Sequence, residues 1–405
     1  MKATYIHLIN KKRFTNTLFF FFFFVTLVIY PLLAKLVTLS NWGLIVNRVI
    51  YFLTLGLFFL FTLITKGKYK NTGIIWLWVV IYLTISLLLY SASTGSFMLI
   101  YREFLFSIVP FIMYAAFTKY YPFRDTILKL IVLVSIFAAV FGFLMFLNIN
   151  FILFQLIKNT VSDGDQTLRL FSYTGPIFLG YLSVTAISIL LFNKSLFKYQ
   201  PILFFVLVLT VIVCGQRSPI GGLVILFITK LFYTESKRGL LIFNVVFILM
   251  ISALLLYLIN RLQIIDMDIL DTLNILYASK FETVRIISDR TDQQQIFNTH
   301  HLINILFGEG FGKYSQENEV AIIAMSDAGG YRLYNEIGFL GLILYMSFFI
   351  NKLFEGIKQN NPLIVSIILY TLFASFFNRI LFAAPMSFIP FIIIAVSNRN
   401  ANLKI

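Results

Sequence analysis

The segment 326–341 combines residues that could bind a negatively charged substrate and transfer a proton. Asp327 offers a carboxylate, which can act as a general base when it lies beside a reacting hydroxyl group. Arg332 offers a planar guanidinium, a group well suited to binding phosphate. If the segment is helical, four residues spaced by four, four and three positions share one stripe: Asp327, Tyr331, Asn335 and Gly338. The pattern indicates a carboxylate that faces an anion-binding pocket.

A purely structural interpretation of the same segment is equally open. Asp327 could be the N-cap of the helix, and Arg332 with Glu336 could form an ion pair between residues four positions apart. Gly338 and Gly341 would allow another helix to approach closely. Residue types and spacings alone do not separate these structural roles from a catalytic one.

Two further arginines precede expected helix starts. Arg217 is followed by Ser218, an expected N-cap, and by Pro219, an expected first helical residue. Arg169 likewise precedes Pro176, where another helix is expected to begin. The free amide groups of a helix start bind anions, so each arginine could complete an anion site. Residues that are simply typical of helix starts, beside an arginine whose side chain reaches to the membrane surface, would explain the same patterns.

Metal and nucleotide sites are not favoured. The adjacent His300 and His301 have no further ligands at metal-binding spacing, and Cys214 has no second cysteine to pair with. The glycine-rich stretch 308–312 follows no expected strand of a nucleotide-binding fold. A tight turn leading towards Asp327 accounts for it. We therefore expect neither a metal nor a cofactor.

The elements that must position these residues are membrane helices. Apolar residues make up 60% of the 405 positions and charged residues only 12%, far less charge than soluble domains carry. Apolar runs of about twenty residues recur, and a helix of that length crosses roughly 30 Å of hydrocarbon. The net charge of +15 then reports topology and contact with anionic lipid rather than nucleic-acid binding. The phenylalanine run 19–24 is expected to face lipid.

Twelve spans are expected, with both termini on the cytoplasmic side. They are 17–37, 44–65, 73–90, 97–117, 126–149, 176–192, 201–215, 219–234, 240–260, 332–350, 362–377 and 380–397. The loops rich in Lys and Arg all fall on one side, whereas the short loops at 40–41 and 91–96 carry neither residue. By the positive-inside rule the basic side is cytoplasmic. The expected fold class is therefore an all-α, polytopic helix bundle of a bacterial cytoplasmic membrane.

This topology divides the chain into three parts. Residues 1–260 form a transmembrane domain of about nine spans, 261–331 a large and partly helical outer loop, and 332–405 the last three spans with a cytoplasmic tail. Eight arginines fall at or beyond the outer boundary: Arg102, Arg169, Arg217, Arg261, Arg285, Arg290, Arg332 and Arg379. A single arginine could snorkel or pair with an acid, but the set indicates an anionic ligand at the outer face.

Several of these stretches resemble motifs of the Wzy-type polysaccharide polymerases, within the O-antigen polymerase and ligase superfamily. Ten residues separate Arg169 from Gly180, a spacing seen in an outer-loop arginine motif of that family. The stretch 216–218, Gln-Arg-Ser, resembles the family's Ser-Arg-Ser turn. The stretch 307–310, Phe-Gly-Glu-Gly, resembles the glycine-rich stretch that follows the loop arginine, here Arg290.

The segment after the long loop carries the most telling resemblance. The ligase branch has His-Asn, nine residues, a glycine and a second glycine three positions later. This chain has Asp327-Ala328, nine residues, Gly338 and Gly341. Asp in place of His departs from the ligase pattern and is similar to the form found in many capsule and O-antigen polymerases.

The resemblance implies a metal-independent membrane glycosyltransferase of GT-C-type architecture. Such an enzyme joins undecaprenyl-pyrophosphate-linked oligosaccharide units into O-antigen or capsular polysaccharide at the outer face of the membrane. Asp327 would be the catalytic base, and the residues that bind substrate would be Arg102, Arg169, Arg217, Arg290, Tyr331, Arg332 and Glu336. The implied partners are the lipid-linked oligosaccharide and membrane lipid, and not nucleic acid. Whether a chain-length regulator protein also binds is left open.

Three other functions compete with polymerisation. An O-antigen ligase, which transfers the glycan to lipid A-core, is a close alternative within the enzyme class, although Asp327 departs from the histidine of the ligase pattern. A flippase for lipid-linked oligosaccharides would usually show two related halves and short outer loops, whereas this chain has no internal repeat and one long loop. A membrane acyltransferase would favour a histidine within the spans, and the expected spans contain none.

Overall fold

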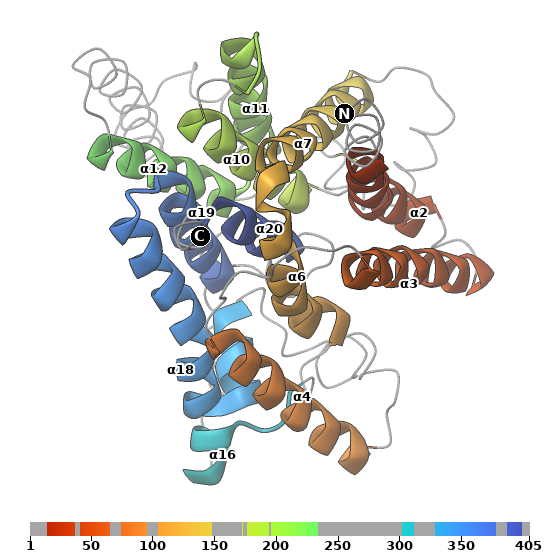
Figure 1. Ribbon diagram of the computed structural model, residues 1–405, viewed down its shortest axis with the longest axis vertical. Coiled ribbons are helices and arrows are strands. Elements are labelled where there is room, and N and C mark those ends of the chain that lie inside the picture. The colour runs from red at the N-terminus through yellow and green to blue at the C-terminus, as the bar shows by residue number, and fades with distance from the viewer. Residues whose placement is uncertain are drawn as a thin grey trace, which may run out of the picture.

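A computed structural model of the chain shows an assembly of helices (Figure 1). It describes residues 14–36, 41–64, 74–94, 104–147, 172, 176–193, 196–233, 302–311, 329–377 and 387–398. Within these ranges every regular element is a helix and none is a strand. The prediction of an all-α protein is therefore confirmed for the described part of the chain.

In the amino-terminal half, the first described residues, 14–24, are helical and lead without a gap into the next element. The elements are η1 (Val25–Ile29), α2 (Tyr30–Leu36), α3 (Asn41–Ile64), α4 (Ile75–Thr94), η3 (Phe104–Ile108), α6 (Val109–Phe117), η4 (Thr118–Phe123) and α7 (Arg124–Phe146). The element η4 is a short 3₁₀ segment with non-helical geometry at Tyr120, so α6 and α7 are separate helices.

The second half supplies the helices that carry most of the candidate residues. They are α10 (Pro176–Phe192), α11 (Gln200–Cys214), α12 (Arg217–Phe232), α16 (Leu302–Phe307), α18 (Gly329–Lys358), α19 (Pro362–Phe377) and α20 (Phe388–Ser397). Every predicted span except 240–260 overlaps a described helix, and 240–260 lies outside the described residues. Helix positions were therefore well predicted.

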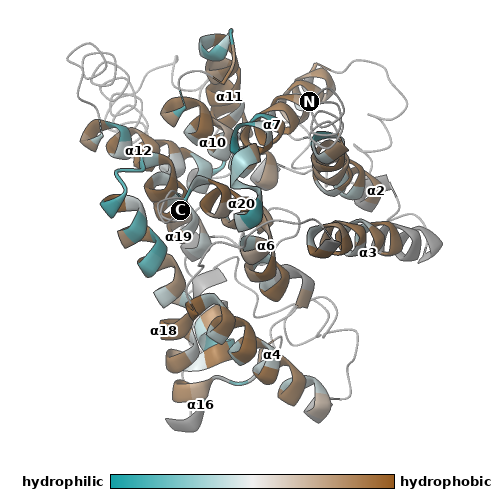
Figure 2. Ribbon diagram, viewed as in Figure 1, coloured by the Kyte–Doolittle hydropathy of each residue, from teal (hydrophilic) through white to brown (hydrophobic). Residues whose placement is uncertain are grey.

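Among the residues that the structure describes, four helical stretches are long and apolar enough to cross a membrane. They are Phe14–Leu33, Ile75–Ala92, Val109–Met145 and Leu333–Lys358. Figure 2 shows hydrophobic residues along most of the helices, whereas hydrophilic residues gather at some helix ends, clearly so at the end of α18. The described part of the chain is thus all-α, with stretches long and apolar enough to cross a membrane. The count of twelve spans and the likeness to GT-C-type enzymes stay predictions.

The phenylalanine run points inward as much as outward, which corrects the expectation that it faces lipid. Phe19, Phe22 and Phe23 are at most 2% exposed, whereas Phe20 and Phe21 are at least half exposed. The buried members pack in an aromatic cluster with rings of α3 and α6, because residues three and four positions apart share a helix face.

Helix ends that were predicted on the basic side contact one another. Arg124, at the start of α7, donates to the side-chain oxygen of Asn193, which follows α10. Lys230, near the end of α12, donates to the carbonyl oxygen of Leu191 in α10 at 3.3 Å. These contacts hold the start of α7 and the ends of α10 and α12 together. The side of a membrane on which they lie stays a prediction.

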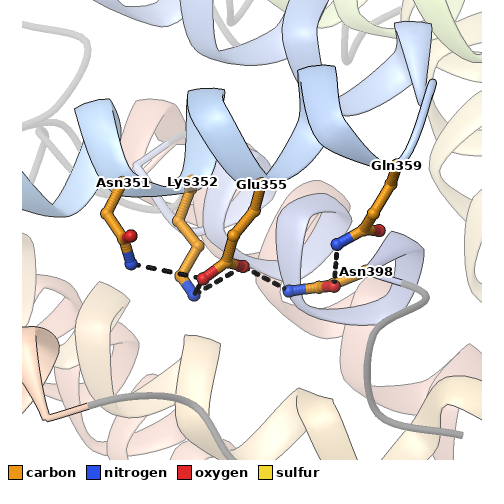
Figure 3. A network of polar contacts seen from close by, with 5 residues as sticks. All are labelled: Asn351, Lys352, Glu355, Gln359 and Asn398. Carbon is orange, nitrogen blue, oxygen red and sulfur yellow. Dashed lines mark hydrogen bonds and ion pairs between the residues drawn. The ribbon is translucent and has the colours of Figure 1, made fainter. Parts of the chain in front are cut away.

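The ends of α18 and α20 meet in a polar network (Figure 3). The ammonium of Lys352 lies 2.8 and 2.9 Å from the two carboxylate oxygens of Glu355. Asn351 and Asn398 donate to the same carboxylate, and Gln359 donates to Asn398. The network joins the end of α18 to the end of α20.

Candidate functional site

A break in α18 forms the centre of the candidate site. At Gly338 the backbone adopts φ 66° and ψ −175°, so the helix of 329–337 does not continue regularly into 339–358. The stripe expected from Asp327 to Gly338 therefore ends where the regular helix is interrupted, and Asp327 itself lies outside the described residues. A broken helix frees backbone carbonyl groups, and in an apolar environment these groups need other donors.

The turn after α16 supplies two of those donors. The amide of Glu309 donates to the carbonyl oxygen of Asn335 at 2.8 Å, and the amide of Gly310 donates to that of Glu336 at 3.1 Å. A third donor comes from α4, where the hydroxyl of Tyr82 lies 2.8 Å from the carbonyl oxygen of Ile337. The last three carbonyls before the break are thus satisfied from outside α18.

Two glycines allow the turn and the break to touch. Both have positive φ, 80° at Gly308 and 66° at Gly338. A Cβ atom at Gly308 would lie 2.3 Å from the carbonyl oxygen of Glu336, and one at Gly338 would lie 2.3 Å from the amide nitrogen of Gly308. The glycine-rich stretch is therefore the tight turn that the sequence predicted, and it packs directly on the break in α18.

A second contact, between α10 and the start of α12, lies next to two of the motif stretches, 169–180 and 216–218. A Cβ atom at Gly180 in α10 would lie 2.6 Å from Cγ of Pro219. The helix begins at Arg217, and Gln216 occupies the N-cap position without a side-chain capping bond. The expectation that Ser218 is the N-cap and Pro219 the first helical residue is therefore wrong by two positions. The expected start of α10 at Pro176 agrees with the structure.

The predicted site residues are distributed as follows. Arg217 is the first residue of α12, and Tyr331 and Arg332 lie in the first turn of α18. Glu336 lies one turn later and is fully buried. Four predicted residues lie outside the described residues: Arg102, Arg169, Arg290 and Asp327. The structure therefore brings Tyr331, Arg332 and Glu336 onto one helical segment that ends at the break.

The buried Glu336 is the strongest chemical feature of the described site. Its side chain is 0% exposed and that of the neighbouring Asn335 is 4% exposed. Glu336 lies in the stretch Leu333–Lys358, which is long and apolar enough to cross a membrane. In a helix that does cross one, an acidic residue is costly and is typical of functional sites, as is a discontinuous helix. Irregular backbone at membrane depth is tolerated where it is buried in protein or lines a cavity. Here the break is buried against the turn at Gly308.

Metal ligands do not gather in the described part of the molecule. Within those ranges no three His, Cys, Asp or Glu side chains lie close enough together to hold a metal ion. The single cysteine, Cys214, is buried at the end of α11.

Sequence reasoning missed both the break and its support from α4. The spacing of Gly338 and Gly341 was compatible with an unbroken helix, so nothing local marked the interruption. A usable signal was present in α4, where the hydroxyl-bearing residues Tyr82, Ser86 and Tyr90 recur at four-residue steps and so share one helix face.

Comparisons with known proteins do not assign the chain to a family. No family model matches it, and no curated protein matches it either. The resemblance to the Wzy-type polymerases therefore remains a prediction from the motifs.

Proposed function

We propose that the protein polymerises undecaprenyl-pyrophosphate-linked oligosaccharide repeat units into O-antigen or capsular polysaccharide. The reaction would take place at the outer face of a bacterial cytoplasmic membrane, where the lipid-linked units are presented. The helical fold with membrane-crossing stretches supports the membrane setting of this proposal.

The contact between separate motif stretches carries the proposal. Four stretches support the resemblance to the polymerases: 169–180, 216–218, 307–310 and 326–341. In the structure, Gly180 of the first touches Pro219 next to the second, and Gly308 of the third touches Gly338 of the fourth. The contacts join the stretches in two pairs, one at the start of α12 and one at the break in α18. Motif stretches that are distant in sequence are expected to meet in this way where they build parts of a functional site.

The proposed chemistry is a glycosyl transfer. Asp327 takes the proton of the acceptor sugar hydroxyl as its oxygen attacks the anomeric carbon of the donor chain. The bond between that carbon and the pyrophosphate oxygen breaks, and undecaprenyl pyrophosphate leaves. Arg169, Arg217 and Arg290 bind the pyrophosphate and stabilise its charge as it departs. Each well-placed donor of this kind lowers the barrier by about 3 kcal/mol.

The other candidate residues hold the substrate in this scheme. Tyr331, Arg332 and Glu336 lie on the segment that ends at the break in α18 and would contact sugar hydroxyls or phosphate. Arg102 would contribute from the outer end of another helix. The positive charge of the arginines supplies what a metal ion would otherwise supply, so the proposal requires none.

The surface-glycan ladder of a strain that lacks the gene tests the proposal. Deletion is expected to leave single repeat units, and the wild-type gene is expected to restore the ladder. Asp327→Ala is expected to abolish the ladder at normal expression, because the base is lost. Asp125→Ala is the matched control, since Asp125 is an exposed acid paired with the adjacent Arg124 and should leave the ladder intact.

The same experiment separates the alternatives. Polymer that forms but never reaches its final acceptor in the deletion strain would show a ligase and refute the polymerase. Repeat units that accumulate only on the cytoplasmic leaflet would show a flippase. A full ladder in the Asp327→Ala strain would refute the role of Asp327 as the base.

A further inference from the structure

One face of α4 contacts both parts of the candidate site. Tyr82, Ser86 and Tyr90 share this face because they are four residues apart. The hydroxyl of Tyr82 bonds the carbonyl oxygen of Ile337, directly before the break. The hydroxyl oxygen of Ser86 accepts a bond of 3.1 Å from the amide of Phe311, at the end of the turn. We call the side chains of Tyr82, Ser86 and Tyr90 the α4 seat.

The fit between the α4 seat and the two motifs is close. A Cβ atom at Gly341 would lie 2.5 Å from Cε1 of Tyr82, and one at Gly310 would lie 2.6 Å from Cδ2 of Tyr90. Both tyrosine rings thus rest against glycines of the stretches 307–310 and 326–341. Figure 1 shows α4 crossing α18, against which α16 also packs.

Tyr82 lies at the junction of these contacts. Its hydroxyl is 2.8 Å from the carbonyl oxygen of Ile337 and 3.4 Å from that of Phe307, the last residue of α16. The hydroxyl has a single proton, so the shorter contact is the main hydrogen bond. The side chain therefore ties the end of the segment 329–337 to α4 and lies against the end of α16.

We infer that Tyr82 is a positioning residue for the candidate site. Its hydroxyl holds the carbonyl end of the segment that carries Tyr331, Arg332 and Glu336, and the α4 seat as a whole holds the turn 308–311 against the break. Tyr82 itself contacts backbone rather than substrate in this role. The inference rests on the proposed function for its effect on polymerisation, whereas the contact it describes is independent of that function.

Tyr82→Phe tests the inference because it removes only the hydroxyl. In the full-length protein in lipid nanodiscs, hydrogen exchange of the Glu309 and Gly310 amides is expected to become about three- to tenfold faster, the effect of one lost hydrogen bond. The rate of polymerisation of lipid-linked repeat units should fall by a similar factor with KM unchanged, since the substrate contacts remain but their alignment is lost.

Thr84→Val is the matched control. It removes a hydroxyl from the same helix, but that hydroxyl bonds the carbonyl oxygen of Val80 within α4. Exchange and rate are expected to match the wild type. If Tyr82→Phe does not accumulate in the membrane, Ser86→Ala tests the same seat, with faster exchange of the Phe311 amide and a slower rate as the expected results.

The outcomes are separable. Wild-type exchange at Glu309 and Gly310 in Tyr82→Phe would overturn the inference, and so would faster exchange with an unchanged polymerisation rate. A wild-type protein that does not polymerise repeat units would refute the proposed function. The exchange comparison would then still decide whether Tyr82 holds the turn and the break together.

Discussion

At the scale of single residues, Gly338 decides whether the candidate site can form. Its φ of 66° and ψ of −175° fall in a region that is open almost only to glycine. Its α-carbon also faces the turn, where Gly308 is the matching small residue. Two independent requirements, one of backbone conformation and one of space, therefore apply to the same position.

Gly338→Ala is expected to destabilise the protein by at least about 1–3 kcal/mol, the usual cost of holding a side chain in such a conformation. The overlap of the new Cβ with the backbone of Gly308 adds to this cost. Thermal unfolding of the purified protein in detergent measures the effect. Polymerisation should be lost as well, because the segment that ends at the break moves.

Gly56→Ala is the control for that measurement. Gly56 lies inside α3, and a Cβ atom there would meet nothing within 4 Å. Alanine is a better helix former than glycine by about 1 kcal/mol, so this variant should be neutral or slightly more stable. If Gly338→Ala and Gly56→Ala change the thermal stability equally, the conformation at Gly338 is not strained for other residues.

At the scale of elements, the polar network in Figure 3 fixes α18 against α20. Lys352 is 3% exposed and pairs with Glu355, which is itself anchored by Asn398 after α20. The ammonium of Lys352 also lies 5.5 Å from the ring centre of Tyr114 in α6. The ion pair within α18 therefore contacts residues of α6 and of the end of α20. It lies at the opposite end of α18 from the break.

Glu355→Gln is expected to lower stability by roughly 3 kcal/mol, because it leaves the buried ammonium of Lys352 without its carboxylate. The double variant Lys352→Met, Glu355→Gln should recover much of that loss, since no unpaired charge remains. Melting temperatures in detergent measure both. Lys358→Met, an exposed site on the same helix, should change little. If the double variant is no more stable than Glu355→Gln, the loss of stability does not come from the unpaired charge of Lys352.

The elements differ in how far their sequences predict them. Helix positions followed from apolar length alone, since a membrane helix satisfies its own backbone. The break at Gly338 could not be predicted in this way, because its cause lies in a contact with the distant turn at Gly308. The inward half of the phenylalanine run was missed for a similar reason: residue type shows that Phe19 is apolar, but not which neighbours bury it.

At the scale of the whole molecule, the predicted topology can be compared with the packing of three helices, α7, α10 and α12. Basic residues at the start of α7 and the end of α12 contact the end of α10. The start of α12 contacts the start of α10 instead, where the outward arginine motif was predicted. For α7, α10 and α12 these contacts agree with the sides that the positive-inside rule predicts, and the orientation in a membrane stays a prediction.

Cysteine labelling of intact cells tests this orientation. In a Cys214→Ala background, which removes the single and buried native cysteine, Lys358→Cys at the end of α18 is expected to resist a membrane-impermeant maleimide until the cells are permeabilised. Asp292→Cys, in the long loop predicted outside, is expected to react in intact cells. The reverse labelling pattern would show that the topology is the opposite of the one predicted. Arg217, Arg332 and the proposed site would then lie on the cytoplasmic side, where polymerisation of exported repeat units cannot occur.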